Sequence, residues 1–372
     1  MAKKDVLRFG VIGVNGMGFG HVKTCIASPA AELVAICDID EAIAQQRRSE
    51  AGVDVPIYRD YQEMIAQERL DAVALGTPHY LHAPMTIYAA DHGLHVLTEK
   101  PLAISVAQCD AMIEACKRNG VVLGVGHQRR WSSAIRGLRR TINDGSLGRP
   151  MRFFYSTASI RHEGYYASGD WRGTWAQEGG GALINQFVHD LDVLCYLMGP
   201  PETVMAYSAN WGHKNEVDDL DLAIVKFQSG WVGTISFSLV SAGGNGGITN
   251  VWEGDEAVIR GNQIAKRNMP AAKFIAESPD MKPELGEWQD IAPVGLPKQG
   301  RDLYYENFLN AVNGVEPFEG TGEECRWAVE LDNAIFLSAI TGKRISVPVD
   351  RAESTRMFDD LVAKRAALPR MR

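Results

Sequence analysis

Three polar side chains fall on one face of a segment that otherwise has the pattern of an apolar helix, about Leu183–Leu197. Asn185, His189 and Asp192 have the spacing i, i+4 and i+7, which places them along one stripe of an α-helix. His189 can exchange a proton near neutral pH, whereas Asn185 can orient a neighbour but cannot take its proton. The stripe indicates an acid–base site that faces a cavity, or else a polar network that ties the helix to a sheet.

Residues 9–20 read FGVIGVNGMGFG, the pattern of a strand, a glycine-rich turn and the start of a helix. Backbone N–H groups of such a turn, together with a helix N-terminus, can bind a pyrophosphate. Gly13 and Gly18 occupy the first and third positions of the pattern G-x-G-x-x-G, and Asn15, which tolerates left-handed backbone, occupies the second. The predicted cofactor contacts in this turn are Gly13, Asn15, Gly16 and Met17.

A carboxylate at the end of the second predicted strand favours NAD over NADP. Asp38 follows the glycine turn at the distance where an acidic side chain accepts hydrogen bonds from a ribose 2′-hydroxyl. Asp38 and nearby Asp40 would repel a 2′-phosphate, so we expect NAD to be the cofactor. The alternative is a surface turn followed by an aspartate that caps the next helix.

Lys100 follows an apolar stretch that we expect to end at the carboxyl edge of a parallel sheet, where ligands bind in doubly wound folds. Next to a positively charged, oxidised nicotinamide, a lysine loses its proton more readily. Lys100 could then accept a proton from a hydroxyl group while hydride passes to the cofactor. The alternative is a solvated lysine at the end of a strand.

The elements that position these residues divide the chain into two halves. Up to about residue 125, short apolar runs alternate with amphipathic helical stretches, which is typical of βαβ units and of a parallel sheet covered on both faces. We therefore expect an α/β, doubly wound (Rossmann) domain over residues 1–127. Its predicted strands are Leu7–Ile12, Leu33–Cys37, Ala72–Leu75, His95–Leu97 and Val121–Val125.

Longer alternating segments predict an α+β domain with a largely antiparallel open sheet over residues 128–350, followed by a helical segment over 351–372. A glycine-rich loop over 242–247 separates two of its strands. Such a sheet offers a flat face for subunit pairing, so we expect a dimer or tetramer. The predicted strands are Met151–Tyr155, Thr203–Trp211, Leu222–Phe227, Val232–Leu239 and Asn250–Ile259, and the later helices are Asp302–Val312, Glu323–Thr341 and Glu353–Ala367.

Composition and charge exclude several classes of protein. The 372 residues carry 38 Lys and Arg against 46 Asp and Glu, a net charge of −8, whereas a nucleic-acid-binding domain needs a basic face. No apolar run approaches the ~20 residues of a membrane span, and no signal peptide precedes the first strand, so we expect a cytoplasmic protein. The six cysteines are scattered without a CxxC pair, which argues against a disulfide framework and against a zinc site, and we expect no metal.

Several short motifs follow the glycine turn in order along the chain. They are GTPHYLH (76–82), EKP (99–101), GHQRRW (126–131), WR (171–172) and GGGALIN (179–185), the last followed by His189 and Asp192. This ordered combination, which covers about residues 6–350, resembles the Gfo/Idh/MocA family of sugar and polyol oxidoreductases. The resemblance implies hydride transfer between a sugar or polyol hydroxyl and nicotinamide.

The resemblance also implies a role for each matching residue. Lys100 matches the catalytic lysine, His189 the histidine that touches the reacting hydroxyl, and Asp192 a substrate-contacting acid. Asn185 departs from relatives that carry Asp there in a Lys-Asp-His set, although other relatives carry Asn; it and Arg129 are further expected substrate contacts. The expected cofactor contacts in these motifs are Thr77, Pro78, His79, His82, Glu99, Lys100, Gln128, Trp171 and Arg172.

Aromatic side chains precede the Gly-Gly-Gly segment, and among them Tyr165 and Trp175 could pack on the C–H faces of a sugar. A plain core cluster is the alternative. Cations in the same half of the chain could favour an acidic sugar or simply be solvated: Arg161, His162, His213 and Lys214.

The sequence therefore predicts an NAD-dependent sugar or polyol dehydrogenase with Lys100 and His189 as acid and base. Two other functions fit the same cofactor site. One is an NAD-dependent glycoside hydrolase that works by transient oxidation, elimination and return of the hydride. The other is a non-catalytic NAD-binding regulator, which the presence of both Lys100 and His189 disfavours.

Overall fold

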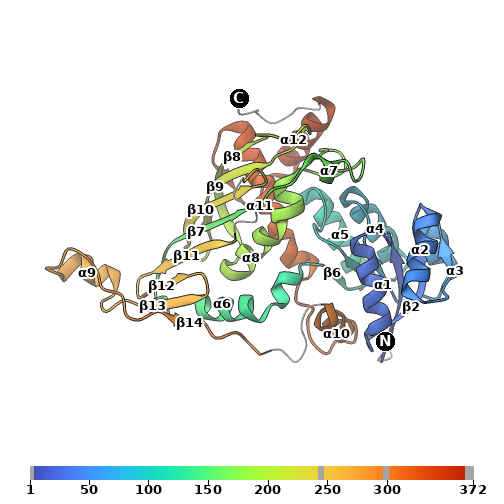
Figure 1. Cartoon of the computed structure of the whole chain (residues 1–372), viewed down its shortest axis with the longest axis horizontal. Coiled ribbons are helices and arrows are strands. Elements are labelled where there is room, and N and C mark those ends of the chain that lie inside the picture. The colour runs from blue at the N-terminus through green and yellow to red at the C-terminus, as the bar shows by residue number, and fades with distance from the viewer. Residues whose placement is uncertain (1–3, 242–246, 296–300, 365–372) are drawn as a thin grey trace. The chain divides into compact units, whose positions relative to one another are not determined.

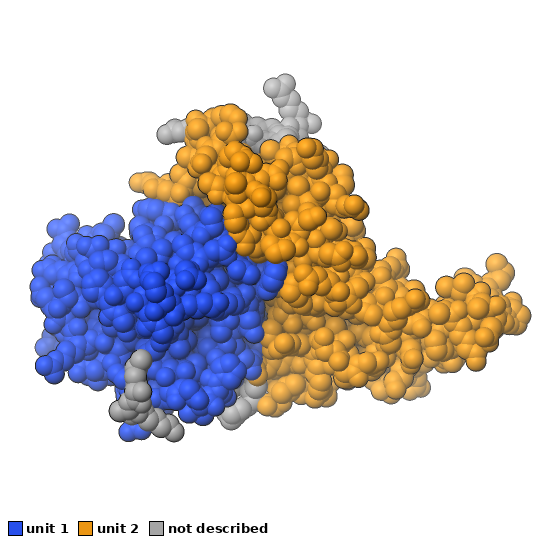
Figure 2. Space-filling view, turned by 180° about the vertical axis from the view of Figure 1, so that it is seen from behind, with its two compact units in different colours: residues 1–131, 297–329 blue, residues 132–296, 330–372 orange. Residues whose placement is uncertain are grey.

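The computed structural model describes residues 4–241, 247–295 and 301–364, and the chain divides into two compact units (Figure 2). Unit 1 comprises residues 1–131 and 297–329, and unit 2 comprises residues 132–296 and 330–372. Residues 242–246 of the predicted glycine-rich loop and residues 365–367 of the last predicted helix lie outside the described residues. None of the helices in the described part of the chain has both the length and the hydropathy needed to cross a membrane.

Unit 1 is built on a six-stranded parallel sheet of order β3-β2-β1-β4-β5-β6, which confirms the predicted doubly wound fold. The runs that predicted strands are fully buried in β4 and β5, as expected for a sheet covered on both faces. Only the two-residue strand β3 was not predicted, because it is too short to show a pattern. The strands are β1 Leu7–Ile12, β2 Ala31–Cys37, β3 Ile57–Tyr58, β4 Ala72–Leu75, β5 His95–Thr98 and β6 Leu123–Val125.

Helices alternate with these strands, and local signals fix their ends. Asp40 accepts hydrogen bonds from the first backbone N–H groups of α2, Ser105 caps α5, and both helices end in left-handed glycines, Gly52 and Gly120. The helices are α1 Met17–Ala27, α2 Glu41–Ala51, α3 Tyr61–Gln67, α4 His82–Asp91 and α5 Val106–Asn119, with short 3₁₀ turns at His79–Leu81 and Gln128–Trp131.

A helix from late in the chain completes the core of unit 1. The α10 helix (Arg301–Val312) buries Tyr305 against Phe9, with ring centroids 5.2 Å apart, and the Tyr305 hydroxyl lies 2.8 Å from His21 Nδ1. Residues 297–329 therefore belong to unit 1, whereas the sequence analysis placed them in a second domain over residues 128–350. This assignment could not be predicted from the order of elements along the chain, because the aromatic residues of α10 pack against strands near the N-terminus.

Unit 2 carries a nine-stranded sheet of order β14-β13-β12-β11-β7-β10-β9-β8-β15, antiparallel except for the β7–β10 pair, which confirms the predicted architecture. The predicted strand Asn250–Ile259 is instead two strands of a hairpin, since the chain turns at Asp255 and Glu256. The strands are β7 Pro150–Ala158, β8 Pro201–Ala209, β9 Leu220–Phe227, β10 Val232–Ser238, β11 Thr249–Gly254, β12 Ala257–Arg260, β13 Gln263–Lys266, β14 Gln289–Asp290 and β15 Ile345–Ser346.

One face of this sheet is covered by the segment that carries the polar stripe (Figure 1). The Phe187 ring stacks on Phe237 of β10 with centroids 4.8 Å apart, and the Tyr155 hydroxyl donates to Asp190 at 2.6 Å. The chain passes from unit 1 to unit 2 within α11. The helices are α6 Ser133–Asn143, α7 Glu163–Tyr166, a π-helix Ala182–Phe187, α8 Val188–Met198, α9 Ala271–Glu277, α11 Gly322–Thr341 and α12 Arg351–Lys364.

Candidate active site

Three glycines bring the backbones of unit 1 together at the carboxyl ends of β1 and β4. A Cβ atom on Gly18 would lie 1.6 Å from the carbonyl oxygen of Gly13, and one on Gly76 would lie 2.4 Å from the Cα of Gly18. Gly13 also adopts a left-handed φ of +75°. Because β1 and β4 flank the point where the strand order reverses, this close approach lies at the usual ligand position of such sheets.

The N-terminus of α1 fits a pyrophosphate. Gly16 precedes the helix with a φ of +53°, no side chain caps the first N–H groups, and Asn15, Gly16 and Met17 are exposed. The helix dipole and helical N–H groups without a side-chain cap favour an anion at this place. The Asn15 Oδ1 accepts hydrogen bonds from Gly16 N–H and from Arg47, at 3.0 and 3.2 Å. Arg47, which the sequence analysis missed, adds positive charge beside the turn.

The two aspartates after β2 have different tasks. Asp38 Oδ2 accepts the N–H of Val14 at 2.9 Å, so this carboxylate also holds the glycine turn, and it stays partly exposed. Asp40 instead caps α2 through the N–H groups of Ala42 and Ile43, at 3.0 and 3.2 Å. The aspartate that caps the next helix is thus Asp40. Asp38 instead lies at the end of β2, where the contact with the ribose was expected.

The loops after β4 and β5 are joined by a buried histidine. His82 places Nδ1 2.8 Å from the carbonyl oxygen of Pro101 and Nε2 3.0 Å from that of Thr77, and burial lowers its pKa. His82 and His79, both expected as cofactor contacts, are buried, with ring centroids 5.9 Å apart. Lys100 is half-buried directly after β5, and its bond to Pro101 is cis.

In unit 2, the predicted polar stripe spans two kinds of helix. Asn185 lies in the π-helix, whereas His189 and Asp192 lie in α8, so the single α-helix predicted over Leu183–Leu197 is wrong in its first turn. Asn185 and Asp192 are buried, and His189 is half-buried. A π-helix is wider than an α-helix and often occurs at functional sites.

The Gly-Gly-Gly segment before the π-helix is fixed by a buried carboxylate. Asp218 accepts the N–H of Gly181 at 2.6 Å and that of Leu183 at 2.8 Å. A Cβ atom on Gly181 would lie 2.3 Å from the Asp218 carbonyl oxygen, so only glycine allows this approach. Asp218 therefore sets the position from which Asn185 extends.

A second buried carboxylate, which the sequence analysis did not find, contacts Asn185 directly. Glu178 is fully buried, accepts hydrogen bonds from the Asn185 amide and the Gly173 N–H, and lies 3.9 Å from Arg172. Burial raises the pKa of Glu178 to about 7, although its three neighbours oppose the shift. The carboxylate that Asn185 lacks is thus supplied by a residue seven positions earlier; its sequence signal is an acid directly before the glycines.

The Tyr165 hydroxyl connects the predicted site residues of unit 2. It accepts hydrogen bonds from Arg172 at 2.6 Å, from Gln186 at 2.7 Å and from Asn185 at 3.1 Å. The Arg172 guanidinium also stacks over the rings of Tyr165 and Trp171, at 4.5 and 4.4 Å. Burial raises the pKa of Tyr165, so it remains a neutral phenol. The structure thus brings Tyr165, Arg172 and Asn185 into one cluster.

Trp175 does not belong to this cluster. It is fully buried and packs edge-on against Phe336 and Phe358, with centroids 5.1 and 6.4 Å away. The prediction that it contacts the substrate is wrong, because its ring fills the core of unit 2.

In unit 1, the 3₁₀ turn Gln128–Trp131 exposes Gln128 and leaves Arg129 half-buried.

Family models match both units. The model for the oxidoreductase family with an NAD-binding Rossmann fold, Gfo/Idh/MocA, matches residues 7–127. The Gfo/Idh/MocA C-terminal domain matches residues 135–263. The chain belongs to the Gfo/Idh/MocA family. It is an NAD-binding oxidoreductase, as the sequence motifs predicted.

Relatives in this family act on sugars and polyols. The chain is 28% identical to 1,5-anhydro-D-fructose reductase of Ensifer adhaerens over 91% of this chain and 98% of the relative. It is 30% identical to scyllo-inositol 2-dehydrogenase (NAD(+)) of Bacillus subtilis over 64% and 69%. The WlbA dehydrogenase of Bordetella pertussis, solved with NADH and UDP-GlcNAcA, is 29% identical with a TM-score of 0.79 over 93% of this chain and all of that chain.

The place of Asp38 at the end of β2 generates a test of cofactor preference. We expect NAD to bind more tightly than NADP, and the Asp38→Ala variant to narrow that difference, because the variant no longer repels a 2′-phosphate. Calorimetric titration of each cofactor checks this, with Asp54→Ala as a control that removes an exposed acid elsewhere in unit 1. Tighter binding of NADP by the wild type would contradict the prediction.

The buried Glu178 generates a pH dependence of stability. Its pKa in the folded chain is about 7 against 4.5 for an ordinary glutamate, so the folded state holds the proton more tightly than the unfolded state. The contribution of this residue to stability is therefore present below pH 4.5 and is lost as the pH rises to about 7, by roughly 3 kcal/mol at most. The neutral variant Glu178→Gln lacks this loss.

The measurement is urea unfolding of the wild type and of Glu178→Gln between pH 4.5 and 8. The variant should gain stability relative to the wild type as the pH rises through this range, whatever the constant offset between them. The control is Glu287→Gln, which removes an exposed glutamate of the same unit. A difference between Glu178→Gln and wild type that does not change with pH would show that Glu178 is ionised throughout.

Proposed function

We propose that this chain oxidises a hydroxyl group of a sugar or polyol, with Lys100 and His189 as its acid–base residues. Bound NAD supplies the hydride acceptor. The observation that carries the proposal is that a chain with an intact phosphate-binding turn also keeps Lys100 at the carboxyl end of β5 and His189 in the first turn of α8. Lys100 is proposed to accept the proton of the reacting hydroxyl, and His189 to hydrogen-bond that hydroxyl.

The other expected contacts support substrate and cofactor in this proposal. Asp192 and Asn185 are proposed to bind substrate hydroxyl groups, and Arg129 and Tyr165 to lie beside them. Trp171 and Arg172 are proposed to contact the nicotinamide end of the cofactor. The relatives that reduce an anhydro-sugar or oxidise an inositol support the substrate class, which is a polyhydroxylated ring or chain.

The experiment that tests the function is a panel of sugars, polyols and aryl glycosides incubated with NAD. Reduction of the cofactor is followed by absorbance, and products are separated and identified. Net formation of NADH with a sugar or polyol supports the dehydrogenase. Glycoside cleavage without net NADH identifies the hydrolase instead, and tight NAD binding with neither reaction identifies a regulator.

Removal of either proposed acid–base residue should strongly lower turnover but leave NAD binding intact. We expect Lys100→Met and His189→Ala each to lower kcat by about 10²-fold or more, because positioned proton transfer contributes on that scale. NAD affinity, measured by calorimetry, should change little. The controls are Lys117→Met and His162→Ala, which alter exposed residues of units 1 and 2. Near-normal kcat in either test variant would refute the role proposed for that residue.

The second face of the unit 2 sheet supports a homo-oligomer. Ile224 of β9 is 55% exposed and pairs with Met205 of β8, which is 48% exposed, while Phe154 of β7, 40% exposed, lies two strands from β9, beyond Thr234 of β10. Several large apolar side chains exposed on one face of a sheet are typical of an interface. We propose that two copies of the chain pair through it, as a dimer or as half of a tetramer.

A charge in this face should separate the subunits. We expect Ile224→Lys to lower the assembly to monomers, because pairing would bury two unpaired ammonium groups across the symmetric interface. Light scattering coupled to size-exclusion chromatography measures the mass. Ile275→Lys is the matched control, since Ile275 of α9 is 80% exposed and lies outside this face. A wild-type chain that runs as a monomer would refute the proposed interface.

A further inference from the structure

Arg161 directly follows the β7 region of unit 2, and its guanidinium contacts only neutral acceptors. One terminal nitrogen donates to Ser159 Oγ at 3.2 Å and to the Ile160 carbonyl at 3.1 Å, and the other donates to Gln186 Oε1 at 2.8 Å. No carboxylate of the described residues lies within 4 Å of it. Arginine keeps its charge at every physiological pH, so this half-buried cation is not neutralised within unit 2.

Three other partly buried arginines of unit 2 do have a carboxylate partner. Arg351 lies 2.6 Å from Glu330, Arg172 lies 3.9 Å from Glu178, and Arg267 lies 4.0 Å from Glu253. Partly buried charges are costly unless they are paired. The contrast indicates that the partner of Arg161 is a group that does not belong to unit 2.

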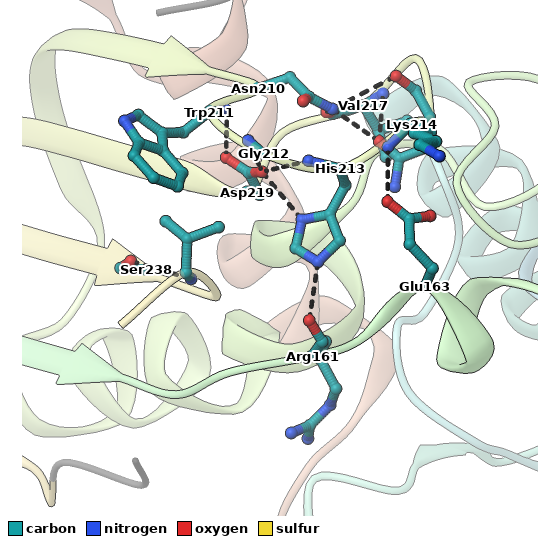
Figure 3. A network of polar contacts seen from close by, with 12 residues as sticks. Arg161, Glu163, Asn210, Trp211, Gly212, His213, Lys214, Val217, Asp219 and Ser238 are labelled. Carbon is teal, nitrogen blue, oxygen red and sulfur yellow. Dashed lines mark hydrogen bonds and ion pairs between the residues drawn. The ribbon is translucent and has the colours of Figure 1, made fainter. Parts of the chain in front are cut away.

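The backbone of Arg161 is held rigidly. Its N–H donates to Leu239 at 3.1 Å, and its carbonyl oxygen lies 2.9 Å from Nε2 of His213, whose Nδ1 lies 2.8 Å from Asp219 (Figure 3). Asp219 also accepts the N–H groups of Trp211 and Gly212, at 2.6 and 2.9 Å.

Burial of the His213 ring opposes its protonation, but the hydrogen bond with Asp219 prevails and raises the pKa of His213. A protonated ring donates from both nitrogens, to the carboxylate and to the Arg161 carbonyl. In Figure 3 the guanidinium points away from this network, which therefore holds the main chain and leaves the cation available.

Arg161 also adjoins the cluster that contains the proposed substrate contacts. Gln186, which accepts from Arg161, donates to the Tyr165 hydroxyl, and the same hydroxyl accepts from Asn185. The guanidinium groups of Arg161 and Arg172 lie 5.5 and 4.5 Å from the Tyr165 ring centroid. Two cations thus share one ring, and the Glu178 carboxylate, which binds Asn185 and Gly173, lies near Arg172, not Arg161.

We propose that Arg161 binds an anionic group of the substrate, so that the substrate is a sugar that carries a carboxylate or a phosphate. The proposal rests on the proposed function, since it assigns the substrate class of that same site. The planar guanidinium suits both groups, because each presents two oxygens to its fork of donors. The pyrophosphate of NAD has its own donors in the glycine turn of unit 1 and does not require this cation.

The experiment compares anionic sugars with their neutral parent in wild type, Arg161→Gln and Arg161→Lys. D-Glucuronate, D-glucose 6-phosphate and UDP-glucose are each compared with D-glucose, and the corresponding galactose series is compared in the same way. We expect at least one anionic member to exceed its neutral parent in kcat/KM by tenfold or more. Arg161→Gln should lower that value about 10- to 100-fold, which is the usual worth of a charge-assisted hydrogen bond. Arg161→Lys, which keeps the charge but loses the fork, should show an intermediate loss.

Three comparisons separate this role from a structural one. The neutral sugar should change less than about threefold in either variant, and the thermal midpoint should remain near that of the wild type. The control Arg149→Gln removes an exposed arginine at the opposite end of β7 and should alter neither arm more than about twofold. The anionic sugar whose kcat/KM falls in Arg161→Gln identifies the anion that Arg161 binds as a carboxylate, a sugar phosphate or a diphosphate.

A binding assay keeps the proposal testable if no sugar reduces NAD. Calorimetry with the same anionic and neutral sugars, in the presence of NADH, should show anion-selective binding that Arg161→Gln removes. Such binding without turnover would refute the proposed function but support the role of Arg161. Equal loss in the anionic and neutral arms, or no loss in any arm with either assay, would overturn the proposal for Arg161.

Discussion

The carboxylate of Asp218 holds the part of unit 2 on which its other site residues depend. It is fully buried and accepts the N–H groups of Gly181 and Leu183, and its own carbonyl accepts the N–H of Ala182. A buried N–H left without an acceptor costs about 1–3 kcal/mol, so this single residue determines where the π-helix begins. Asn185 follows within that helix, and the Tyr165 and Glu178 contacts follow from the position of Asn185.

The core of unit 2 contains other buried carboxyl groups besides that of Asp218. Asp221 and Asp332 are fully buried as well, and burial together with the neighbouring Asp218 raises their pKa values well above the usual range. A core that must keep protons on carboxylates is less stable at high pH, by the same linkage that applies to Glu178. In unit 1 the glycine turn instead depends on close backbone approach at Gly13 and Gly18, together with the Asp38 carboxylate that accepts the N–H of Val14.

Local signals explain which parts of the fold could be predicted from sequence. The strands of unit 1, the turn at Gly13 and the position of Asp38 depend on periodicity and on residue types within a short stretch, and the structure shows the expected elements there. Trp175 was misassigned because an aromatic residue next to a loop has the same local pattern whether it meets a sugar or Phe336.

The missed features all depend on contacts between distant residues. Glu178 is a site candidate only because its carboxylate contacts Asn185, and Arg161, one of four cations named from the sequence, differs from the others only through its neutral neighbours. The π-helix has no residue pattern of its own, since the hydrogen bonds of Gly181 and Leu183 to Asp218 determine it. These are tertiary constraints that periodicity does not record.

The place of α10 in unit 1 has a consequence for synthesis on the ribosome. Domains generally fold as units, and N-terminal domains fold first as the chain emerges. Here Tyr305 and Phe308 are core residues of unit 1, yet they are translated after strands β7 to β14 of unit 2. The nascent N-terminal unit therefore exposes the apolar surface around Phe9 throughout that interval. Unit 1 can therefore complete its core only after most of unit 2 has been synthesised.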